Sequence, residues 1–507
     1  MLEEQKIALQ EELDEDSLII YNNIPYSVIA DDLSESDKNE YYGEVESIMK
    51  LYRAYKKGQK FLTEGSNADY VSSKLRYKKS ASIINKEARF LFANPPTFNV
   101  NLDDVTGEMK TQNTILQNFL DRVLKKNHFS KKLLKAAKDC FIGKRVALVL
   151  NFNEEFGINV TFLNALEFIY EMSGDGEELT KIVTFYNMED TTNKQLQRWF
   201  KKVYTLEEDG YVYVEESIYD GLGVLVEEVT PKRKTLFEYI PAVVIVNDGL
   251  TGETKGESEL AQLLEYEGVY SKLANADIDA GRKGMNPVRY TIDAAPESTS
   301  DLSIAPGSYW DLQTDDNKVN ESTQARVGIL EPAMNFSSPL KVTLDRIENT
   351  MYSEVDVPNI TSEQLQGVIT SGKTLKALYW GLTVRCDEKM LAWGDALTFM
   401  AETIIEGGLL YPKCITKYTT ATSLPQVPYD VLVENNYPLP EDVEEEKSMD
   451  LAEISAQAMS RKAYLKKWRK LSDKEADEEL QQIKAEQDLF ENSALPPTDM
   501  SDFEGAE

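Results

Sequence analysis

Cysteine and histidine are scarce in this chain of 507 residues. Three cysteines, Cys140, Cys386 and Cys414, lie far apart in the sequence, and His128 is the only histidine. Three scattered thiols cannot form a cysteine-rich zinc cluster or a disulfide framework, and an odd number is typical of a reducing compartment. We therefore expect each thiol to be a small buried apolar group. A Ser-His-Asp triad would have to use His128, which has no nucleophile motif near it and is interpreted as a surface helix residue.

Basic residues are outnumbered, with 55 Lys plus Arg against 87 Asp plus Glu and a formal net charge of −32. Tight binding to a phosphate backbone depends on Lys and Arg that displace counterions, so a simple DNA-binding regulator is disfavoured. The pairs Asp277 with Asp279 and Asp315 with Asp316 have the spacing of metal ligands, but such pairs arise by chance in an acidic chain. The sequence predicts no metal site and no cofactor.

Long apolar runs are absent as well. The longest, Val146–Leu150 and Ala242–Val246, are far shorter than the roughly 20 residues that span a bilayer. Residues 1–16 are acidic, whereas a secretory signal begins with basic residues and continues with an apolar stretch. The sequence thus predicts a soluble protein. Its 42% of apolar residues can build sizeable cores, and its length suggests about three structural units.

The pattern of the first half predicts an α+β domain. Helical spacing of apolar residues alternates with β-branched segments, and from about residue 153 to 246 short alternating runs punctuated by Gly and Asp indicate antiparallel β structure. The earlier segments, in order, are a helix over 38–62, a helix over 83–92 stopped by Asn94-Pro95-Pro96, a strand over 97–102, one or two helices over 110–142, and a strand over 145–152.

Near residue 250 the pattern becomes helical. A long helix is expected from Gly256 to about Lys283, and a second from about Pro339 to Glu354. Between them, Met285–Met334 is rich in Pro, Ser and Asp and predicts a small β-containing module inserted between two helices. A loop-like stretch then leads into a long helix from Lys373 to about Glu406, which Gly407-Gly408 would close.

From Pro440 onward the chain is helical and strongly charged, and the acidic residues after Pro496-Pro497 predict a disordered tail. The basic run Arg461–Lys470 is interleaved with Tyr464 and Trp468, a composition that suits nucleic-acid contact. Pairing with the acidic helices beside it is the favoured interpretation.

One motif points to a different chemistry. Residues Gly367–Thr374 match the phosphate loop G-x-x-x-x-G-K-[ST], in which a buried strand delivers the loop to a helix N-terminus. The polar residues 361–366 cannot form that strand, and the candidate acidic strand Ala242–Asp248 precedes the motif by more than a hundred residues. A P-loop NTPase therefore remains an alternative, and a flexible loop that runs into a helix is the favoured interpretation.

The order of these parts resembles the portal proteins of tailed double-stranded DNA bacteriophages, particularly the siphophage type from Gram-positive hosts. The resemblance covers most of the chain. It rests on these segments taken in order: Leu75–Pro96 with its Asn-Lys and Pro-Pro steps, Gly256–Leu260 at the start of a long helix, Thr370–Leu378, Tyr464–Trp468, and Glu478–Ile483.

The resemblance implies an α+β portal fold with named parts. They are a wing over 1–255, a stem helix over 256–284, a clip over 285–338, a second stem helix over 339–355, a tunnel loop over 356–372, a long wing helix over 373–408, a wing β segment over 409–439, a helical crown over 440–490 and an acidic, disordered tail over 491–507. It also implies a ring, typically a dodecamer, at one capsid vertex of the virion, assembled in the host cytoplasm.

Such a ring would not be an enzyme. It would be a conduit for double-stranded DNA in packaging and ejection, and a docking platform for terminase, head-completion protein, major capsid protein and scaffolding protein, with no membrane contact. A third hypothesis is an acidic ring-forming scaffold that binds only proteins. Acidic channel walls would repel phosphates and keep a duplex centred, while short neutral loop side chains touch it without strong counterion release.

The resemblance also assigns residues. The tunnel loop would face DNA through Val357, Asn359, Ile360, Gln364, Leu365, Gly367, Val368, Thr370 and Lys373. The clip would face terminase and connector proteins through Arg289, Tyr290, Tyr309, Trp310 and Arg326.

Overall fold

The structure is a computed structural model. It describes residues 24–492 except 34, 59–71, 102–107, 175, 177, 190–192, 250–254, 286–287, 300–309, 316–323, 331–336, 361–375, 420, 422, 440–442, 470 and 472. The chain divides into two compact units, one formed by residues 1–360 and 379–438 and the other by residues 361–378 and 439–507. Each is described separately.

The first unit begins with helices. A short helix, α2 (Tyr26–Ile29), and a 3-10 turn, η1 (Ala30–Asp32), precede α3 (Glu35–Lys57). The predicted helix over 38–62 is therefore confirmed, but it ends five residues early. Gly58 explains the end: its φ is +79°, a left-handed conformation that favours glycine, and its amide donates to the Ala54 carbonyl at 2.8 Å. The helix predicted before Asn94-Pro95-Pro96 is α4 (Lys79–Phe92), which buries Ile83, Ile84 and Leu91 completely.

The next helices come as a pair. The segment predicted as one or two helices forms α5 (Glu108–Lys126) and α6 (Phe129–Gly143). His128 lies between them, exposed and in a left-handed conformation with φ 51°, so it is a surface residue of the junction rather than of a helix. Cys140 on α6 is buried, as are Cys386 and Cys414, which confirms the expectation for all three thiols.

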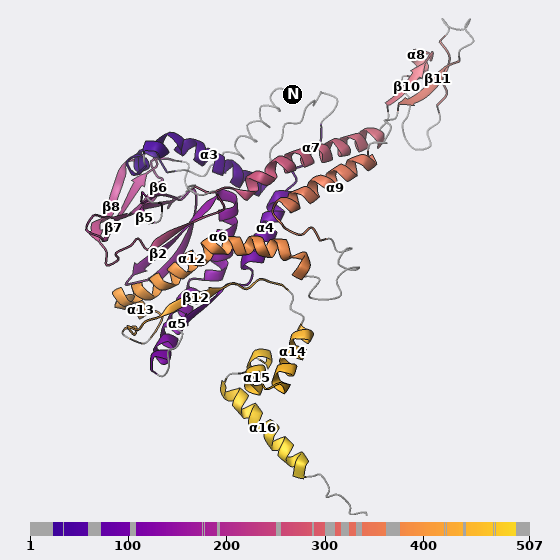
Figure 1. Ribbon diagram of the computed structural model, residues 1–507. Coiled ribbons are helices and arrows are strands. Elements are labelled where there is room, and N and C mark those ends of the chain that lie inside the picture. The colour runs from indigo at the N-terminus through magenta and orange to yellow at the C-terminus, as the bar shows by residue number, and fades with distance from the viewer. Residues whose placement is uncertain are drawn as a thin grey trace, which may run out of the picture. The chain divides into compact units, whose positions relative to one another are not determined.

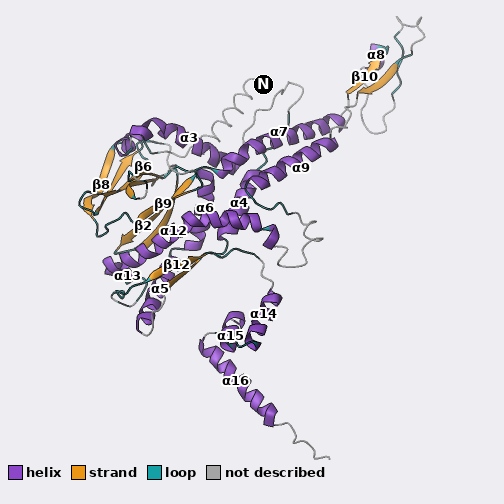
Figure 2. Cartoon of the chain, viewed as in Figure 1, coloured by secondary structure: helices purple, strands orange, loops and turns teal. Residues whose placement is uncertain are grey.

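Two antiparallel sheets form the β core (Figures 1 and 2). The three-stranded sheet has the order β3-β2-β9, and the five-stranded sheet has the order β4-β5-β6-β7-β8. The strands are β2 (Arg145–Asn153), β3 (Gly157–Asn164), β4 (Phe168–Met172), β5 (Leu179–Asn187), β6 (Arg198–Leu206), β7 (Val212–Asp220), β8 (Leu225–Lys234) and β9 (Ala242–Val246). The predicted antiparallel region is confirmed.

Strand β2 is buried on both faces because it lies between two layers. Ala147 and Val149 pack into a core with Phe168, Ile182 and Val214 of the five-stranded sheet. The alternate residues Val146, Leu148 and Leu150 are fully buried on the other face, where α6 and α12 contact the strand. This explains why its sequence is a nearly continuous apolar run.

The insertion predicted between two helices is present. Helix α7 (Glu259–Met285) leads to the antiparallel pair β10 (Val288–Ile292) and β11 (Arg326–Leu330), with the short helix α8 (Pro296–Thr299) between them, and α9 (Ser337–Glu354) follows. Both predicted helices are thus confirmed to within a few residues. Helix α7 starts after Gly256, whose φ is +66° and whose backbone lies so close to Lys144 and Asn247 that a Cβ would clash.

The last part of the first unit is α12 (Trp380–Leu410), followed by α13 (Pro412–Ile415) and β12 (Asp430–Glu434). Strand β12 pairs antiparallel with the early strand β1 (Thr97–Asn101). The expectation that Gly407-Gly408 ends the long helix is wrong. Both glycines are buried inside α12, where a Cβ on Gly407 would lie 2.0 Å from the Phe152 ring.

The second unit contains α14 (Val443–Ser455), α15 (Arg461–Arg469) and α16 (Asp473–Asn492), together with one helical turn over residues 376–378. Its helical and charged character is as the sequence predicts. The tail predicted to be disordered after Pro496-Pro497 lies outside the described residues.

Candidate functional site

Helices α7 and α9 are neighbours in space and frame the inserted module (Figure 2). Tyr266 of α7 donates its hydroxyl hydrogen bond to Glu354 at the end of α9 over 3.0 Å. On α9, Val342 is 66% exposed, and on α7, Val269 is 51% exposed. Each helix thus leaves an apolar side chain exposed in the single chain.

A ladder of polar side chains on α7 holds an extended segment that precedes α4. Glu267, Ser271, Asn275 and Asp279 recur every four residues and so lie on one side of the helix. Asn275 accepts from the Leu75 amide and donates to the Leu75 carbonyl, both at 2.9 Å. Asp279 accepts the Ser73 amide at 3.0 and 3.1 Å. The side chains of α7 thus satisfy backbone groups of residues 72–80 as a neighbouring strand would. Asp279, interpreted from sequence as a solvated acid, is an acceptor in this ladder.

The chain after α9 leaves and returns at nearly the same place. Val357 donates its amide to the Tyr352 carbonyl at 3.0 Å, and Asp356 has φ 50°, which together close α9. A Cβ on Gly381, in the first turn of α12, would lie 3.5 Å from the Asp356 side chain. The chain before and after the intervening segment is therefore adjacent at Asp356 and Gly381.

Three of the residues predicted to face DNA lie at the start of this loop. Val357 is 3% exposed, so its side chain anchors the loop and does not reach a channel, which corrects the expectation for this residue. Asn359 donates from its amide group to Asn349 Oδ1 of α9 at 2.9 Å, and Ile360 is half-buried. The other predicted residues, Gln364, Leu365, Gly367, Val368, Thr370 and Lys373, lie outside the described residues.

The inserted module brings several of its predicted contact residues together. The Arg289 guanidinium lies 5.3 Å from the centroid of the Trp310 ring. Tyr290 stands opposite Gly328 in the β10–β11 register, and its ring occupies the space where a Gly328 side chain would be. Tyr290 is 46% exposed, and Arg326 is exposed on β11. Tyr309 lies outside the described residues.

A cluster of buried charges, which the sequence analysis did not predict, joins three helices. Glu87 of α4 and Glu259 of α7 are 0% and 1% exposed. Arg385 of α12 donates through Nε to Glu87 at 2.9 Å, and its guanidinium lies 3.6 Å from Glu259. Lys389, one turn further along α12, forms an ion pair with Glu259 and donates to Asn247 Oδ1 at 3.1 Å.

The two acids of this cluster have opposite protonation preferences. Burial, and then the negative charge of Glu259, raise the pKa of Glu87 well above its usual range. Burial opposes ionisation of Glu259 too, but Lys389 and Arg385 hold the pKa of Glu259 below its ordinary value. The neutral form is thus favoured at Glu87 and the ionised form at Glu259. Since removing one partner of a buried ion pair leaves a charge uncompensated, this cluster fixes the packing of α4, α7 and α12.

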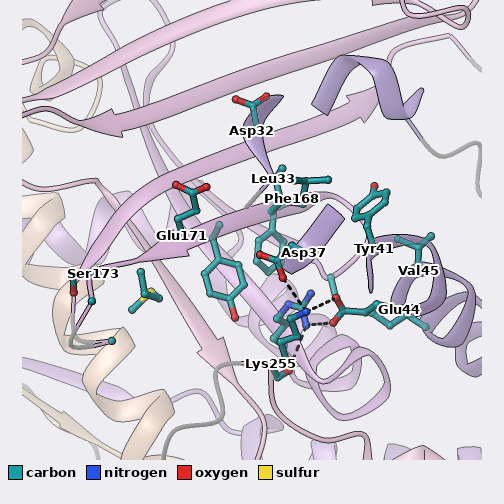
Figure 3. A pocket seen from close by; sticks show the side chains of 18 residues that line it. Asp32, Leu33, Asp37, Tyr41, Glu44, Val45, Phe168, Glu171, Ser173 and Lys255 are labelled. Atoms are coloured by element: carbon teal, nitrogen blue, oxygen red, sulfur yellow. Dashed lines mark hydrogen bonds and ion pairs between the residues drawn. The ribbon is translucent and has the colours of Figure 1, made fainter. Parts of the chain in front are cut away.

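A pocket of about 640 Å³ lies between α3 and the β sheets (Figure 3). Its charged side chains neutralise one another. Lys255 lies 3.0 Å from Asp37 and 3.6 Å from Glu44, and Arg145 donates to Glu44 at 2.7 Å. Lys201 and Lys181 form ion pairs with Asp32 at the same pocket, the latter at 2.9 Å. The pocket is lined by an ion-pair network that ties α3 to β2 and η1 to β5 and β6.

The strand pairing bears on the phosphate-loop motif, which itself lies outside the described residues. Every strand pair in the described part of the chain is antiparallel, and residues 355–360 before the motif form a turn and an irregular segment. A phosphate loop needs a strand of a buried parallel sheet. Among the described residues there is also no group of His, Cys, Asp and Glu suited to a metal ion.

The basic helix of the second unit pairs with its acidic neighbours, as the sequence predicted. Trp468 donates its indole hydrogen to Asp450 of α14 at 2.6 Å, and Lys467 pairs with the same carboxylate at 2.9 Å. Lys462 and Arg469 form ion pairs with Asp477 and Glu479 of α16 at 2.8 and 2.7 Å. Much of its positive charge is thus used within the unit.

Comparison with known proteins identifies the family. Residues 32–489 match the family model described as "Phage portal protein, SPP1 Gp6-like". No curated protein matches the chain. None of the helices in the described ranges is both long and apolar enough to cross a membrane. The match covers nearly the whole sequence, includes the paired helices, the inserted module and the loop between α9 and α12, and agrees with the α+β fold. The chain therefore belongs to the SPP1 Gp6-like family of phage portal proteins, which serve the packaging of DNA into the capsid.

Proposed function

We propose that this portal protein forms a dodecameric ring at a single capsid vertex of a siphophage that infects a Gram-positive host. The ring conducts double-stranded DNA into the capsid during packaging and out of it during ejection. The observation that carries the proposal is the family match over residues 32–489, because it spans all the parts needed for such a conduit in one order. The siphophage type rests on the sequence resemblance described above.

The parts of the chain take the following roles in this proposal. Residues 1–255, 373–408 and 409–439 form the wing; α7 and α9, within 256–284 and 339–355, form the stem; residues 285–338 form the clip; residues 356–372 form the tunnel loop; and residues 440–490 form the crown that faces the capsid interior. The adjacency of Asp356 and Gly381 supports the loop assignment, because it lets the intervening residues project from a fixed base. The pairing of Tyr266 with Glu354 supports a two-helix stem.

The tunnel loop contacts DNA without holding it. Its proposed DNA-facing residues are Asn359, Ile360, Gln364, Leu365, Gly367, Val368, Thr370 and Lys373. Only the last is charged, so few counterions are released on contact and the duplex can slide. The net charge of −32 per subunit repels phosphates and favours passage over binding. The portal performs no catalysis in this scheme, and the force comes from the ATPase of the terminase.

The clip is the docking surface for terminase during packaging and for the head-completion protein afterwards, through Arg289, Tyr290, Tyr309, Trp310 and Arg326. Arginine and aromatic residues are enriched where proteins bind one another, which supports this assignment. The wing contacts the major capsid protein, and scaffolding protein recruits the ring during assembly in the host cytoplasm.

Replacing residues 364–368 by a Gly-Ser segment of equal length tests the tunnel-loop assignment. We expect rings of unchanged mass with impaired DNA packaging. A matched Gly-Ser replacement of residues 207–211, in the loop between β6 and β7, is the control and should package normally. Normal packaging by the tunnel-loop variant would refute the assignment.

The NTPase alternative has its own test. A phosphate loop would make nucleotide binding depend on Lys373. If the chain is a portal without such a loop, calorimetry of the ring with Mg-ATP should show no binding for either the native chain or Lys373→Ala. Binding that disappears in the variant would support the NTPase instead. A ring without a pore wide enough for a duplex, seen by electron microscopy, would favour the protein-only scaffold.

A further inference from the structure

Helix α12 has a second apolar side that its own chain leaves uncovered. Trp380 is 69% exposed and Leu391 is 73% exposed, and Val384 between them is 41% exposed. The opposite side of the helix is buried in the core through Leu382, Cys386 and Trp393. With 3.6 residues per turn, the three exposed residues fall within an arc of about 40°. Single exposed apolar residues are ordinary, but a stripe that includes a tryptophan marks a protein contact.

Acidic residues border this stripe. Glu388 and Asp395 are exposed on α12 and, by the same geometry, lie within about 40° of Val384. They are seven residues apart, which places them about 10 Å apart along the helix axis. The surface therefore combines an apolar strip with an adjacent acidic edge, a combination that fits a partner with apolar groups beside basic side chains.

A lysine stripe with matching spacing lies on another helix of the same chain. Lys131, Lys135 and Lys138 follow one another on α6 at intervals of four and three residues, and the first and last are again seven residues apart. Lys131 and Lys135 are exposed, and in the described part of the chain none of the three side chains forms a hydrogen bond or an ion pair within 4 Å. Arg89 of α4 lies close enough to Lys138 to help lower the pKa of that lysine, after burial. Asp139 follows Lys138 on α6, and Lys135 and Lys138 act electrostatically on this buried acid. The three lysines outnumber it, so this part of α6 is basic although the chain as a whole is strongly acidic.

We propose that the α12 stripe, Trp380 to Asp395, docks on the α6 lysine stripe of the neighbouring copy and so forms a subunit contact of the ring. This inference rests on the ring of the proposed function and names the surfaces that build it. Two different surfaces of identical chains make a head-to-tail contact, the class that closes into a ring. Subunits that each carry −32 repel one another, and paired acidic and basic edges offset that repulsion at the contact.

The α6 lysines of a second copy suit the α12 stripe better than the basic helix α15 does. Three bases of α15 are already engaged, since Lys462, Lys467 and Arg469 form ion pairs with α14 and α16. Within the described residues the side chains of the α6 lysines form no such ion pair. The helix fixes the spacing of their backbone positions, as a complementary row of acids on a partner requires.

Charge reversal on the two faces tests the proposal. One variant carries Glu388→Lys with Asp395→Lys, and the other carries Lys131→Glu with Lys138→Glu. In each variant alone both faces have the same sign, so we expect the ring to dissociate at least tenfold more readily on dilution, measured by native mass spectrometry. In a mixture, the reversed face of one variant matches the reversed face of the other. Rings should therefore reappear with the two variants in equal numbers and in an even total, as alternation around a closed ring requires.

Matched controls separate this contact from a general effect of charge. Glu155→Lys with Glu178→Lys, and Lys194→Glu with Lys417→Glu, make the same charge changes at exposed positions away from both stripes and should leave the ring intact. Circular dichroism and thermal unfolding establish that every variant folds. Trp380→Ser changes no charge and should also weaken the ring, because it removes the apolar part of the contact.

Four outcomes would overturn the proposal. Rings that persist in both reversed variants would show that the contact lies elsewhere, while leaving the ring itself established. Folded variants that fail to reassemble when mixed would show that the two faces do not meet. Intact rings that fail to package DNA only in the lysine variant would assign the lysines to DNA. A native chain that stays monomeric at all concentrations would refute the ring of the proposed function as well.

Discussion

Arg385 of α12 donates a hydrogen bond to Glu87 of α4 over 2.9 Å, at a place where the Glu87 side chain has no contact with solvent. Glu259 of α7 completes the site, and Asp356, two residues after the end of α9, acts electrostatically on the same arginine. The buried cluster therefore connects α4, α7, α12 and the base of the proposed tunnel loop. Any relative movement of these parts during packaging has to preserve this pairing or leave charges exposed to a low dielectric.

The first prediction concerns how the two acids share one negative charge. Glu87→Gln should cost little unfolding free energy because burial and the Glu259 charge already favour the neutral form of Glu87. Glu259→Gln should also lower the unfolding free energy only moderately, because loss of the Glu259 charge lets Glu87 ionise in its place. The double variant leaves Arg385 and Lys389 without a carboxylate and should lose about 3–5 kcal/mol of unfolding free energy. Urea unfolding of all three variants measures the coupling.

In that double-mutant cycle, Glu155→Gln at an exposed position serves as the control. A double variant whose loss equals the sum of the two single losses would mean that the carboxyl groups act independently, and would contradict the shared charge.

The second prediction is a pH dependence that comes from Asp139 of α6. Burial raises the pKa of Asp139 from 3.8 to about 6, partly offset by the hydrogen bond from Tyr52. Between about pH 4 and pH 6 the folded protein therefore holds more protons than the unfolded chain, so stability falls as the pH rises through this window. Asp139→Asn should remove this dependence and stabilise the protein above pH 6 by at most about 3 kcal/mol.

Thermal unfolding from pH 4 to pH 7 checks the effect. The unfolding temperature of Asp139→Asn should rise relative to that of the native protein as the pH rises, whereas that of the exposed Asp31→Asn should follow the native curve. Parallel curves for native protein and Asp139→Asn would exclude Asp139 as the source.

Local periodicity was enough to predict much of this fold. The apolar sides of α4, α7 and α9, and the continuous apolar run of β2, appear in the sequence because each element buries a defined face. The pairing of β1 with β12 could not be predicted, since it joins strands more than three hundred residues apart and nothing in either strand specifies its partner.

The buried cluster was missed because charged residues in an acidic chain look solvated. One signal was present: Glu87 falls on the apolar side of α4, between Ile84 and Leu91, and Lys389 lies between the buried Cys386 and Trp393. A charged side chain at a core position requires a partner, so these positions predict buried ion pairs. The tunnel-facing role of Val357 failed for the opposite reason, because an apolar residue in a loop-like sequence can be buried by the helix that it follows.

The third prediction concerns the polar ladder of α7. Asn275→Ala removes both hydrogen bonds to Leu75, so the segment 72–78 should open more often. We expect hydrogen exchange of the Leu75 amide to speed up at least tenfold, and Asp279→Ala to do the same for Ser73. Asp277→Ala, on the same helix but outside the ladder, should change neither rate. Equal rates in all variants would show that the segment is held by other contacts.

The fourth prediction uses two glycines of α12 that differ only in their surroundings. Alanine stabilises a helix interior by about 1 kcal/mol relative to glycine. At Gly394 the nearest atom to an added Cβ is the Met390 methyl at 3.9 Å, so Gly394→Ala should raise the unfolding free energy by that amount. At Gly407 the Cβ would lie 2.0 Å from the Phe152 ring, and overpacking of this kind costs about 1–3 kcal/mol or more. Gly407→Ala should therefore be destabilising.

A smaller side chain at position 152 should reduce that penalty. In a Phe152→Leu background the space beside Gly407 is larger, and the loss of unfolding free energy caused by Gly407→Ala should shrink by at least 1 kcal/mol, because the clash with the ring is its cause. Urea unfolding of the four chains measures this coupling. If Gly407→Ala stabilised the native chain as Gly394→Ala does, close packing against Phe152 would not be what requires a glycine at position 407.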